Sequence, residues 1–274
     1  VANMPFGTEE INVAGGLSGD PIKVVKCRTS DIMVPAESEI IIEGEVLPGE
    51  FADEGPFGEF AGYMGPVAKK PVARITAITH RKDAIYYGYT SQMPPSESTV
   101  LQSMTNGPLV LKILREDMGD KNVKDVHIDL TFGGLLAHCI VSMTPMHGGH
   151  AKKIGRLIAD MTPLKRVTVV NDDVDIRDPL HVEWAMNSHY HPARDTIIID
   201  DVFFPLGMDP SVRIDNKMQD MGSKVVIDAT MTIDAGQYSL PPKDIMMKAL
   251  DLWKEVGLPE FDIPKRAQFR IDRS

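Results

Sequence analysis

The alternation of apolar and polar positions changes character along the chain. In about the first hundred residues, short β-branched runs such as PIKVVKC (21–27) and SEIIIEGEVL (38–47) are typical of strands, and long helical periodicity is absent. The segment PVARITAITHRKDAIYYGYTS (71–91) predicts a hairpin that turns at residues 81–83. This part of the pattern favours a β-barrel or a β-sandwich.

Residues 97–118 then show apolar side chains at helical spacing, with a break predicted at Gly107-Pro108. From about residue 123, strand and helix patterns alternate, which indicates an α/β layer domain. The predicted strands are 123–132, 135–144, 165–172, 194–203 and 223–230, and the predicted helices are 150–161, 178–189 and 241–257. The expected organisation is therefore α+β, with a barrel portion and its connecting helix over 1–118 and an α/β domain over 119–274. The last helix is amphipathic, so it can pack on its own core or on a second subunit.

The composition and charge of the chain argue against several classes of protein. The 274 residues are 43% hydrophobic and 25% charged, with a net charge of −10 and no basic run, which argues against a nucleic-acid-binding surface. No stretch reaches the ~18 apolar residues of a membrane helix, and the start lacks a secretion signal. Cys27 and Cys139 are too far apart in sequence for a zinc motif, so we interpret both as buried thiols of a cytoplasmic protein. The opening VANMPFG, without an initiator methionine, resembles the interior of a longer chain.

One acidic segment carries candidate chemistry. EFADEGPFGEFAGYMG (50–65) places Glu54 and Glu59 five residues apart among glycines and aromatic residues. An apolar wall raises the pKa of a carboxyl group, and a second carboxylate nearby would separate the two pKa values further. The pair is then a candidate general acid and its partner. The alternative is a solvated acidic turn.

Another candidate lies where HGGHAKKIGRL (147–157) leads from a glycine pair into a helix. Free amide groups at such a helix start, with Lys152 close by, form a potential anion site. The alternative is an ordinary strand-to-helix loop with a surface lysine. The segment has neither the P-loop nor the dinucleotide-binding pattern.

Two polar clusters are better explained by structural roles than by metal binding. The aspartates of NDDVDIRD (171–178) could hold a divalent cation, but their spacing is not that of an EF-hand, and Asp178 before Pro179 is a good helix cap. His189 and His191 of HYHPARD are two residues apart with no third ligand near in sequence, so we interpret them as loop residues.

Together these motifs resemble the UbiD family of reversible decarboxylases over nearly the whole chain, to about residue 260. The likeness rests on the order of long segments: EINVAGGLSGDPIKVVKC, VPAESEIIIEGEVLPGE, EGPFGEFAGYMG, THRKDAIYYGYTSQMPPSE, GHAKK, VVNDDVDIRDPLHVEWAM, PARDTIII and GSKVVIDAT. The resemblance implies prenylated flavin mononucleotide as cofactor, with Mn²⁺ or Mg²⁺ and K⁺. It also implies a split, flavin reductase-like β-barrel followed by an α/β C-terminal domain that mediates oligomerisation, as a dimer or hexamer.

The resemblance also assigns roles residue by residue. Glu59 matches the proton donor, and Glu54 matches the carboxylate that pairs with a catalytic arginine. Glu10, five residues before Gly15, matches a metal ligand. Lys152 matches a lysine that contacts the cofactor phosphate. Two further residues match, more loosely, a loop that lines the flavin: Met4 and Pro5.

The sequence departs from the family in its length. Family members carry an N-terminal domain and the first part of the barrel, which supply the catalytic arginine and the remaining metal ligands. We therefore expect a fragment of a longer protein, or a chain whose N-terminal half is supplied by another chain. The leading hypothesis is decarboxylation, or carboxylation in reverse, of an aromatic or α,β-unsaturated acid with release or uptake of CO₂. The alternatives are a flavin reductase-like barrel that transfers hydride and a non-catalytic or partial subunit.

Overall fold

The computed structural model describes residues 7–131, 138–203, 213–214, 217–218, 221–231, 239–260, 262–263, 268 and 271–272. The chain divides into two compact units, Val1–Ser98 and Thr99–Ser274.

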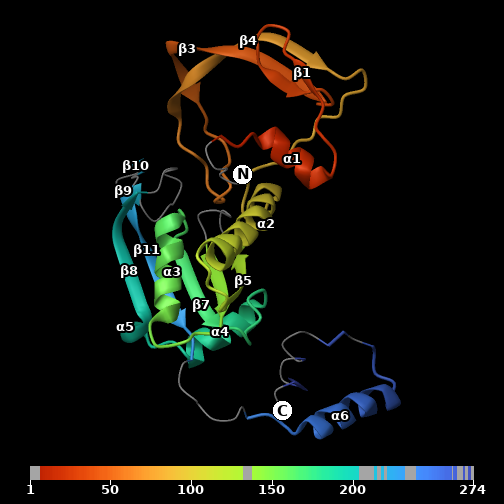
Figure 1. Cartoon of the computed structure of the whole chain (residues 1–274), viewed down its shortest axis with the longest axis vertical. Helices are drawn as coiled ribbons and strands as arrows, with labels where there is room; N and C mark the ends of the chain where they lie inside the picture. Colours follow the sequence, from red (N-terminus) through yellow and green to blue (C-terminus); the bar gives the residue numbers. More distant parts are fainter. Residues whose placement is uncertain are drawn as a thin grey trace. The chain divides into compact units, whose positions relative to one another are not determined.

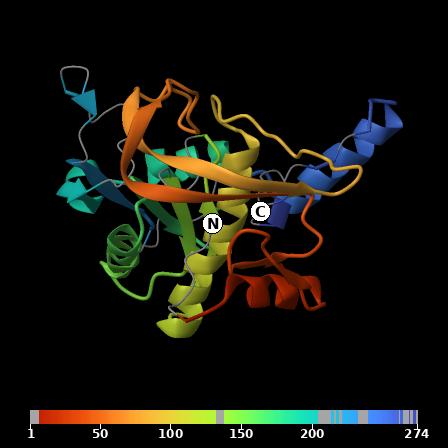
Figure 2. The same ribbon diagram turned by 90° about the horizontal axis from the view of Figure 1, so that it is seen from above.

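In its described residues, the first unit has one short helix and two antiparallel strand pairs. Its elements are α1 (Glu10–Ser18), β1 (Val24–Lys26), β2 (Met33–Pro35), β3 (Ile40–Glu54) and β4 (Ala68–His80). β1 pairs with β2, and the long strand β3 pairs with β4 to form the hairpin drawn in orange in Figure 2. The predicted hairpin over 71–91 is wrong, because its first arm is part of β4 and pairs with β3 instead. Within 84–92 no strand follows the turn, and the Ile85 amide donates to the Glu39 carboxylate at 3.0 Å.

One face of the β3–β4 hairpin carries exposed aliphatic side chains. Ile42 lies opposite Ile78, and Gly44 lies opposite Ile75, so these side chains project to the same face as Val46. Each of the four large residues is more than half exposed: Ile42, Val46, Ile75 and Ile78. Among the described residues of this unit, Ala61 is the one hydrophobic side chain that is fully buried. A unit of this size with so little buried apolar surface lacks the usual source of folding stability.

The second unit is built on a mixed five-stranded sheet in the order β5-β6-β7-β11-β8. β6, β7 and β11 run parallel, while β5 and β8 are antiparallel edge strands. The described elements are α2 (Glu97–Lys112), the π-helix η1 (Ile113–Asp117), β5 (Val123–Ile128), β6 (His138–Met143), α3 (His150–Met161), β7 (Arg166–Asn171), α4 (Pro179–Ser188), α5 (Pro192–Asp195), β8 (Thr196–Phe203), β9 (Arg213–Ile214), β10 (Lys217–Met218), β11 (Met221–Ala229) and α6 (Lys243–Glu255).

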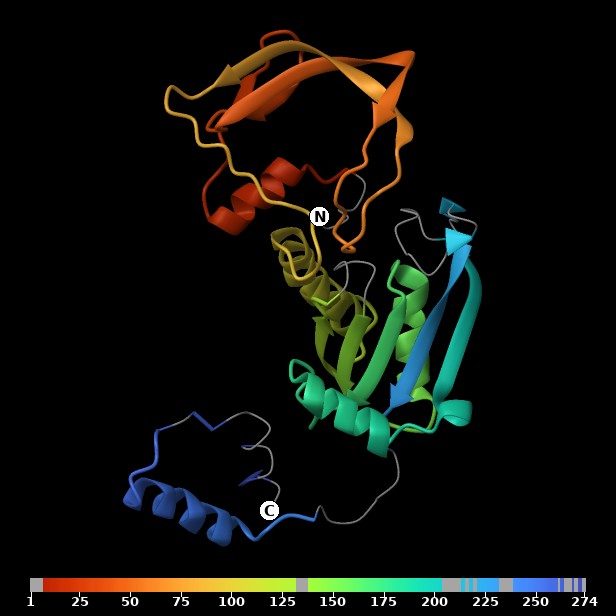
Figure 3. The ribbon, with the colours of Figure 1, turned by 180° about the vertical axis from the view of Figure 1, so that it is seen from behind.

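Helices cover both faces of this sheet. α3 lies on one face, and α4 lies on the other, as the opposite views of Figures 1 and 3 show. One cluster of buried residues joins α2, η1 and α3 to the sheet, and a second joins α4 to the opposite face. At the closest approach of α3, a β-carbon on Gly155 would lie 2.3 Å from a γ-methyl of Val226, so only glycine fits there. The predicted α/β layering is therefore present.

The predicted break at Gly107-Pro108 is wrong, because α2 runs through Pro108. A β-carbon on Gly107 would lie 3.2 Å from the Val126 carbonyl, so the glycine lets α2 approach β5 closely. Val110 and Leu114 are then buried against the sheet. This packing offsets the ~3 kcal/mol that a proline costs inside a helix. The helix that the sequence grouped with the barrel portion therefore packs within the second unit.

Three smaller predictions concern the two cysteines, the last helix and membrane-spanning helices. Cys139 is buried, which raises the pKa of its thiol to about 12, whereas Cys27 is only partly buried. α6 forms as predicted, but none of its residues is buried, and the apolar side chains Ile245 and Leu252 are at least half exposed. In the described part of the chain, no helix combines the length and the apolar character needed to span a membrane.

Candidate functional site

The glutamate pair lies where β3 gives way to a tight glycine-rich turn. β3 ends at Glu54, and Gly55 follows with φ of +95°, a conformation that favours glycine. A single β-bridge then joins Gly58 to Met64. In the segment between these two residues, the Glu59 amide donates to the Tyr63 carbonyl at 2.9 Å. The backbone at Glu59 is therefore fixed by local hydrogen bonds, although the turn contains no regular helix.

The Glu59 carboxyl group folds back over this turn. A β-carbon on Gly65 would lie 3.2 Å from its Oε1 atom, so a side chain at position 65 would crowd the carboxyl group. Burial is the main cause that raises the pKa of Glu59, the Glu54 carboxylate adds to it, and Lys70 opposes both. Glu54 itself is exposed. The structure therefore brings the two predicted glutamates into electrostatic contact, and the acidic turn is not uniformly solvated.

The structure gives less support for the other predicted site residues of the first unit. Glu10 is the first residue of α1 and is exposed. Across the described ranges, no group of three histidine, cysteine, aspartate or glutamate side chains is placed to hold a metal ion. Glu10 would therefore need ligands from elsewhere to complete a metal site. Met4 and Pro5 lie outside the described residues.

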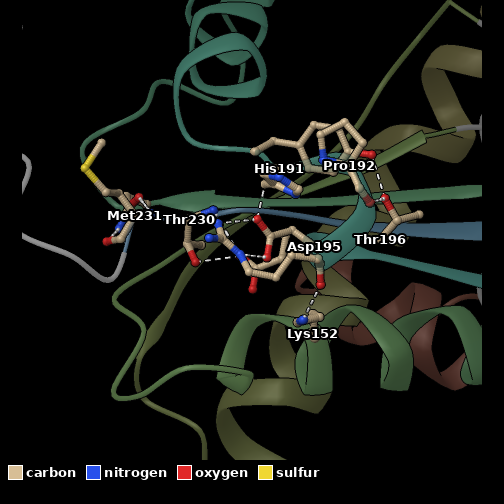
Figure 4. Close-up of polar contacts among 11 residues, drawn as sticks. Lys152, His191, Pro192, Asp195, Thr196, Thr230 and Met231 are labelled. Carbon is tan, nitrogen blue, oxygen red and sulfur yellow. Dashed lines mark hydrogen bonds and ion pairs between the residues drawn. The ribbon is translucent and has the colours of Figure 1, made fainter.

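Lys152 lies in a cavity of about 640 Å³ within the second unit, close to the carboxyl ends of the parallel strands. Its Nζ atom donates to the Arg194 carbonyl at 2.7 Å (Figure 4). Arg194 in turn makes a two-point ion pair with Asp195, with both N–O distances at 2.7 Å. This pair is the main cause that lowers the pKa of Asp195, although burial opposes it. The cavity is lined by Gly148, Gly149, Lys152, Ser188, His189, Arg194, Asp195, Asp228, Thr230 and Met231.

Several of these lining residues were missed by sequence reasoning. Asp228 is the second-last residue of β11 and accepts hydrogen bonds from the Thr230 amide at 3.0 Å and hydroxyl at 2.6 Å. His189, interpreted as a loop residue, ends α4 and is only 8% exposed. Burial is the main cause that lowers its pKa. The sequence signal that was available is the position of Asp228 at the end of an apolar strand run, where ligand sites of open α/β sheets occur.

The capping prediction for the aspartate cluster is confirmed. The Asp178 carboxylate accepts a hydrogen bond from the Leu180 amide at 2.9 Å, and Pro179 begins α4. His191 similarly precedes Pro192 at the start of α5. Both residues therefore have structural roles at helix starts, and neither belongs to a candidate metal site in the described part of the chain.

Comparison with known proteins places both units in one family. Residues 1–94 match the model of the 3-octaprenyl-4-hydroxybenzoate carboxy-lyase Rift-related domain, and residues 99–229 match the model of the C-terminal domain of the same enzyme. These two matches cover most of the chain. The chain belongs to the UbiD family.

Similar proteins span more than this chain. An uncharacterized protein of Archaeoglobus fulgidus is 36% identical over 234 residues, which are 84% of this chain and 46% of that protein. The FMN complex of the UbiD-class enzyme HmfF from Pelotomaculum thermopropionicum superposes with a TM-score of 0.76 at 32% identity, over 91% of this chain and 55% of that one. Vanillic acid decarboxylase of Sedimentibacter hydroxybenzoicus gives 0.73 at 30% identity, over 89% and 53%. The chain therefore spans about half the length of the relatives that it matches.

Proposed function

We propose that this UbiD chain is part of a carboxy-lyase that removes CO₂ reversibly from an aromatic or α,β-unsaturated carboxylic acid, with prenylated flavin mononucleotide as cofactor. The observation that carries the proposal is the partly buried Glu59 carboxyl group, which lies over Gly65 in a glycine-rich turn beside Glu54; burial and Glu54 both raise its pKa. Membership of the family and the likeness to HmfF and vanillic acid decarboxylase support it. An evolved dimeric form of HmfF, in complex with prFMN, is similar as well, at 33% identity and a TM-score of 0.72, over 89% of this chain and 51% of that chain.

Glu59 would serve as the acid. When CO₂ leaves, the carbon that carried it needs a proton, and a carboxyl group that stays protonated above its usual range can donate one. In the direction of carboxylation, the Glu59 carboxylate would take that proton back. The prenylated flavin, when bound, supplies the electron sink for the bond that breaks. Glu54, which is exposed, would help keep the pKa of Glu59 high and would pair with an arginine supplied from outside this chain.

The residues present fit the cofactor in part. The ammonium group of Lys152 at the start of α3 suits a phosphate, and on the family resemblance it would contact the flavin phosphate. Met4 and Pro5 would line the flavin. Glu10 offers one hard oxygen ligand of the kind that Mn²⁺ and Mg²⁺ prefer, and the other ligands would have to come from outside the chain. The K⁺ ion is an expectation from the same resemblance.

A complementing N-terminal half is the second element of the proposal. The aliphatic face of the β3–β4 hairpin is exposed on four large residues, and the chain spans about half the length of its relatives. Strands from that half, on the same or another chain, would cover this face and complete a split β-barrel. Burying such a face would contribute about 25 cal/mol per Å² of apolar surface. Assembly into a homo-oligomer remains part of the same proposal.

Replacement of the acid tests the proposal. In the enzyme reconstituted from both halves, Glu59→Gln should lower decarboxylation by about 10²-fold or more while flavin content stays unchanged. Glu45→Gln is the matched control, because Glu45 is an exposed glutamate on β3 and lies outside the turn. CO₂ release and flavin absorbance are measured on the same preparations. Near-wild-type turnover in the flavin-loaded Glu59→Gln variant would contradict the assignment, and NADH-dependent flavin reduction by both variants would instead favour hydride transfer.

A further inference from the structure

The turn that carries Glu59 is in close contact with residues 91–94, which follow β4 in the chain and precede α2. Both segments belong to the first unit. We propose that Gly58 and Gly62 are positioning residues, which seat the turn against residues 91–94 and so fix where the Glu59 carboxyl group lies. The inference rests on the proposed role of Glu59 as the acid, and it adds the residues that hold that acid in place.

Gly58 makes the first close contact. A β-carbon at this position would lie 2.7 Å from the Ser91 carbonyl oxygen. That oxygen belongs to the backbone, so no change of side-chain rotamer can relieve the contact. To restore the ordinary contact distance of 3.4 Å, the turn and Ser91 would have to move apart by about 0.7 Å. Glycine at position 58 therefore permits an approach that a side chain would prevent.

Gly62 makes the second close contact, three residues after Glu59. A β-carbon there would lie 2.9 Å from the Met93 sulfur, 3.1 Å from Cδ of Pro94 and 3.2 Å from the Met93 α-carbon. The sulfur belongs to a flexible side chain that is 68% exposed, but the other two atoms are fixed by the backbone and the proline ring. Gly62 also has φ of +86°, so glycine is favoured there for two separate reasons.

Local hydrogen bonds connect these contacts to Glu59. The Glu59 carbonyl accepts from the Gly62 amide at 2.9 Å, and the Glu59 amide donates to the Tyr63 carbonyl at the same distance. The backbone of Glu59 is therefore bonded directly to a residue that touches the 91–94 segment. Ala61, between the two, is only 2% exposed, so the turn is well packed. A displacement at Gly58 or Gly62 would consequently move Glu59 as well.

The position of the Glu59 carboxyl group sets both its pKa and its reach. Burial is the main cause that raises this pKa, so moving the turn away from residues 91–94 would admit water and lower the pKa toward its usual 4.5. A proton donor must also lie within hydrogen-bond reach of its target, and a displacement of about 1 Å can lower turnover by about 10²-fold. A purely structural role would change the stability of the turn without changing the pKa of Glu59.

Gly58→Ala and Gly62→Ala test the proposal, with Gly49→Ala as the matched control. Gly49 lies in β3 with φ of +83°, but a β-carbon there would meet no atom within 4 Å. The control therefore reproduces the backbone strain of Gly62→Ala without its contacts. The pKa of Glu59 is measured in the 274-residue chain by NMR of carbon-labelled glutamate carboxyl groups, and Glu59→Gln assigns the signal. We expect the pKa to fall toward 4.5 in both variants and to stay unchanged in the control.

Turnover by the enzyme reconstituted from both halves is the second measurement. In both variants kcat for CO₂ release should fall about tenfold or more, and its descending limb should move to lower pH, with flavin content unchanged. Adding Met93→Ala to Gly62→Ala should restore part of kcat, because it removes the contact at 2.9 Å. Circular dichroism checks that each variant is folded.

The NMR titration decides the proposal, and a single folded variant is enough for it. The proposal is overturned if the pKa of Glu59 in Gly58→Ala or Gly62→Ala equals that in Gly49→Ala. A lowered pKa in these variants, together with a wild-type enzyme that releases no CO₂, would instead support the positioning of Glu59 and contradict the proposed function. The two failures are therefore distinguishable.

Discussion

The packing of α3 on the sheet makes a quantitative prediction about Gly155. In a free helix, Gly155→Ala would be favourable by about 1 kcal/mol. Here the added β-carbon would lie 2.3 Å from the nearer γ-methyl of Val226, about 1 Å inside the ordinary contact distance of 3.4 Å. Val226 is fully buried and β-branched, so its side chain has little room to turn away from the added β-carbon. We take the overpacking cost at about 2–3 kcal/mol, which leaves a net loss of about 1–2 kcal/mol in the free energy of unfolding.

Urea denaturation followed by far-ultraviolet circular dichroism measures this loss. Val226→Ala removes the clashing methyl groups, so it serves as the background in which the same substitution is repeated. In that background, Gly155→Ala should cost nothing or should stabilise, which gives a coupling energy of about 2 kcal/mol between the two sites. The reasoning is refuted if Gly155→Ala alone is as stable as the wild type, or if its cost is the same in both backgrounds.

Two further predictions concern pH. Because burial and then Glu54 raise the pKa of Glu59 above its usual 4.5, decarboxylation by the reconstituted enzyme should fall as the pH rises through that raised value. The descending limb of the kcat profile should move to lower pH in Glu54→Gln, and a limb that does not move would contradict the coupling. Burial alone would raise the pKa of Asp120, but hydrogen bonds from His150 and Asn122 hold it below its usual 3.8. The stability that Asp120 contributes is therefore present above pH 3.8 and lost as the pH falls through the lower folded value, and urea titrations should show Asp120→Asn removing about 1–3 kcal/mol at pH 7 but much less in acid.

Local patterns predicted the second unit well because its elements depend on local physics. The strands predicted over 165–172 and 223–230 contain successive buried positions, 167–170 and 226–229, as expected for strands covered on both faces by helices. The helix 178–189 was predicted from its cap, and Asp178 does bond to the first turn. In each case the residues that fix the element lie within a few positions of it.

The errors arose where distant segments decide the structure. The hairpin over 71–91 was predicted from β-propensity alone, but strand pairing with 40–54 takes its first arm and leaves the second without a partner strand in the described residues. The break at Pro108 was predicted from a local cost, which burial of Val110 and Leu114 against the sheet outweighs.

The predictions for the candidate site also succeeded where the determinants are local and failed where distant segments come together. The pair Glu54 and Glu59 was found because both residues lie in one short turn, and local geometry sets their interaction. The hydrogen-bond partner of Lys152 and the other lining residues were not found, since Arg194 and Asp228 lie 42 and 76 positions further along the chain. Only the closing of α3 over β11 brings these residues to one cavity, and no spacing rule in a single sequence encodes that closure.

The central claim is that this chain and a complementing N-terminal half together form a flavin-dependent carboxy-lyase. The most direct measurement compares CO₂ release and bound flavin in two preparations, the 274-residue chain alone and the same chain with that half, each supplied with prenylated flavin, Mn²⁺ and K⁺. We expect neither tight flavin binding nor CO₂ release from the chain alone, because Glu10 is the one metal ligand that it is predicted to provide and Glu54 lacks its arginine. The added half should restore flavin binding and CO₂ release together. Stoichiometric flavin binding with CO₂ release by the chain alone, or flavin binding without CO₂ release from any aromatic or unsaturated acid after the half is added, would contradict the account.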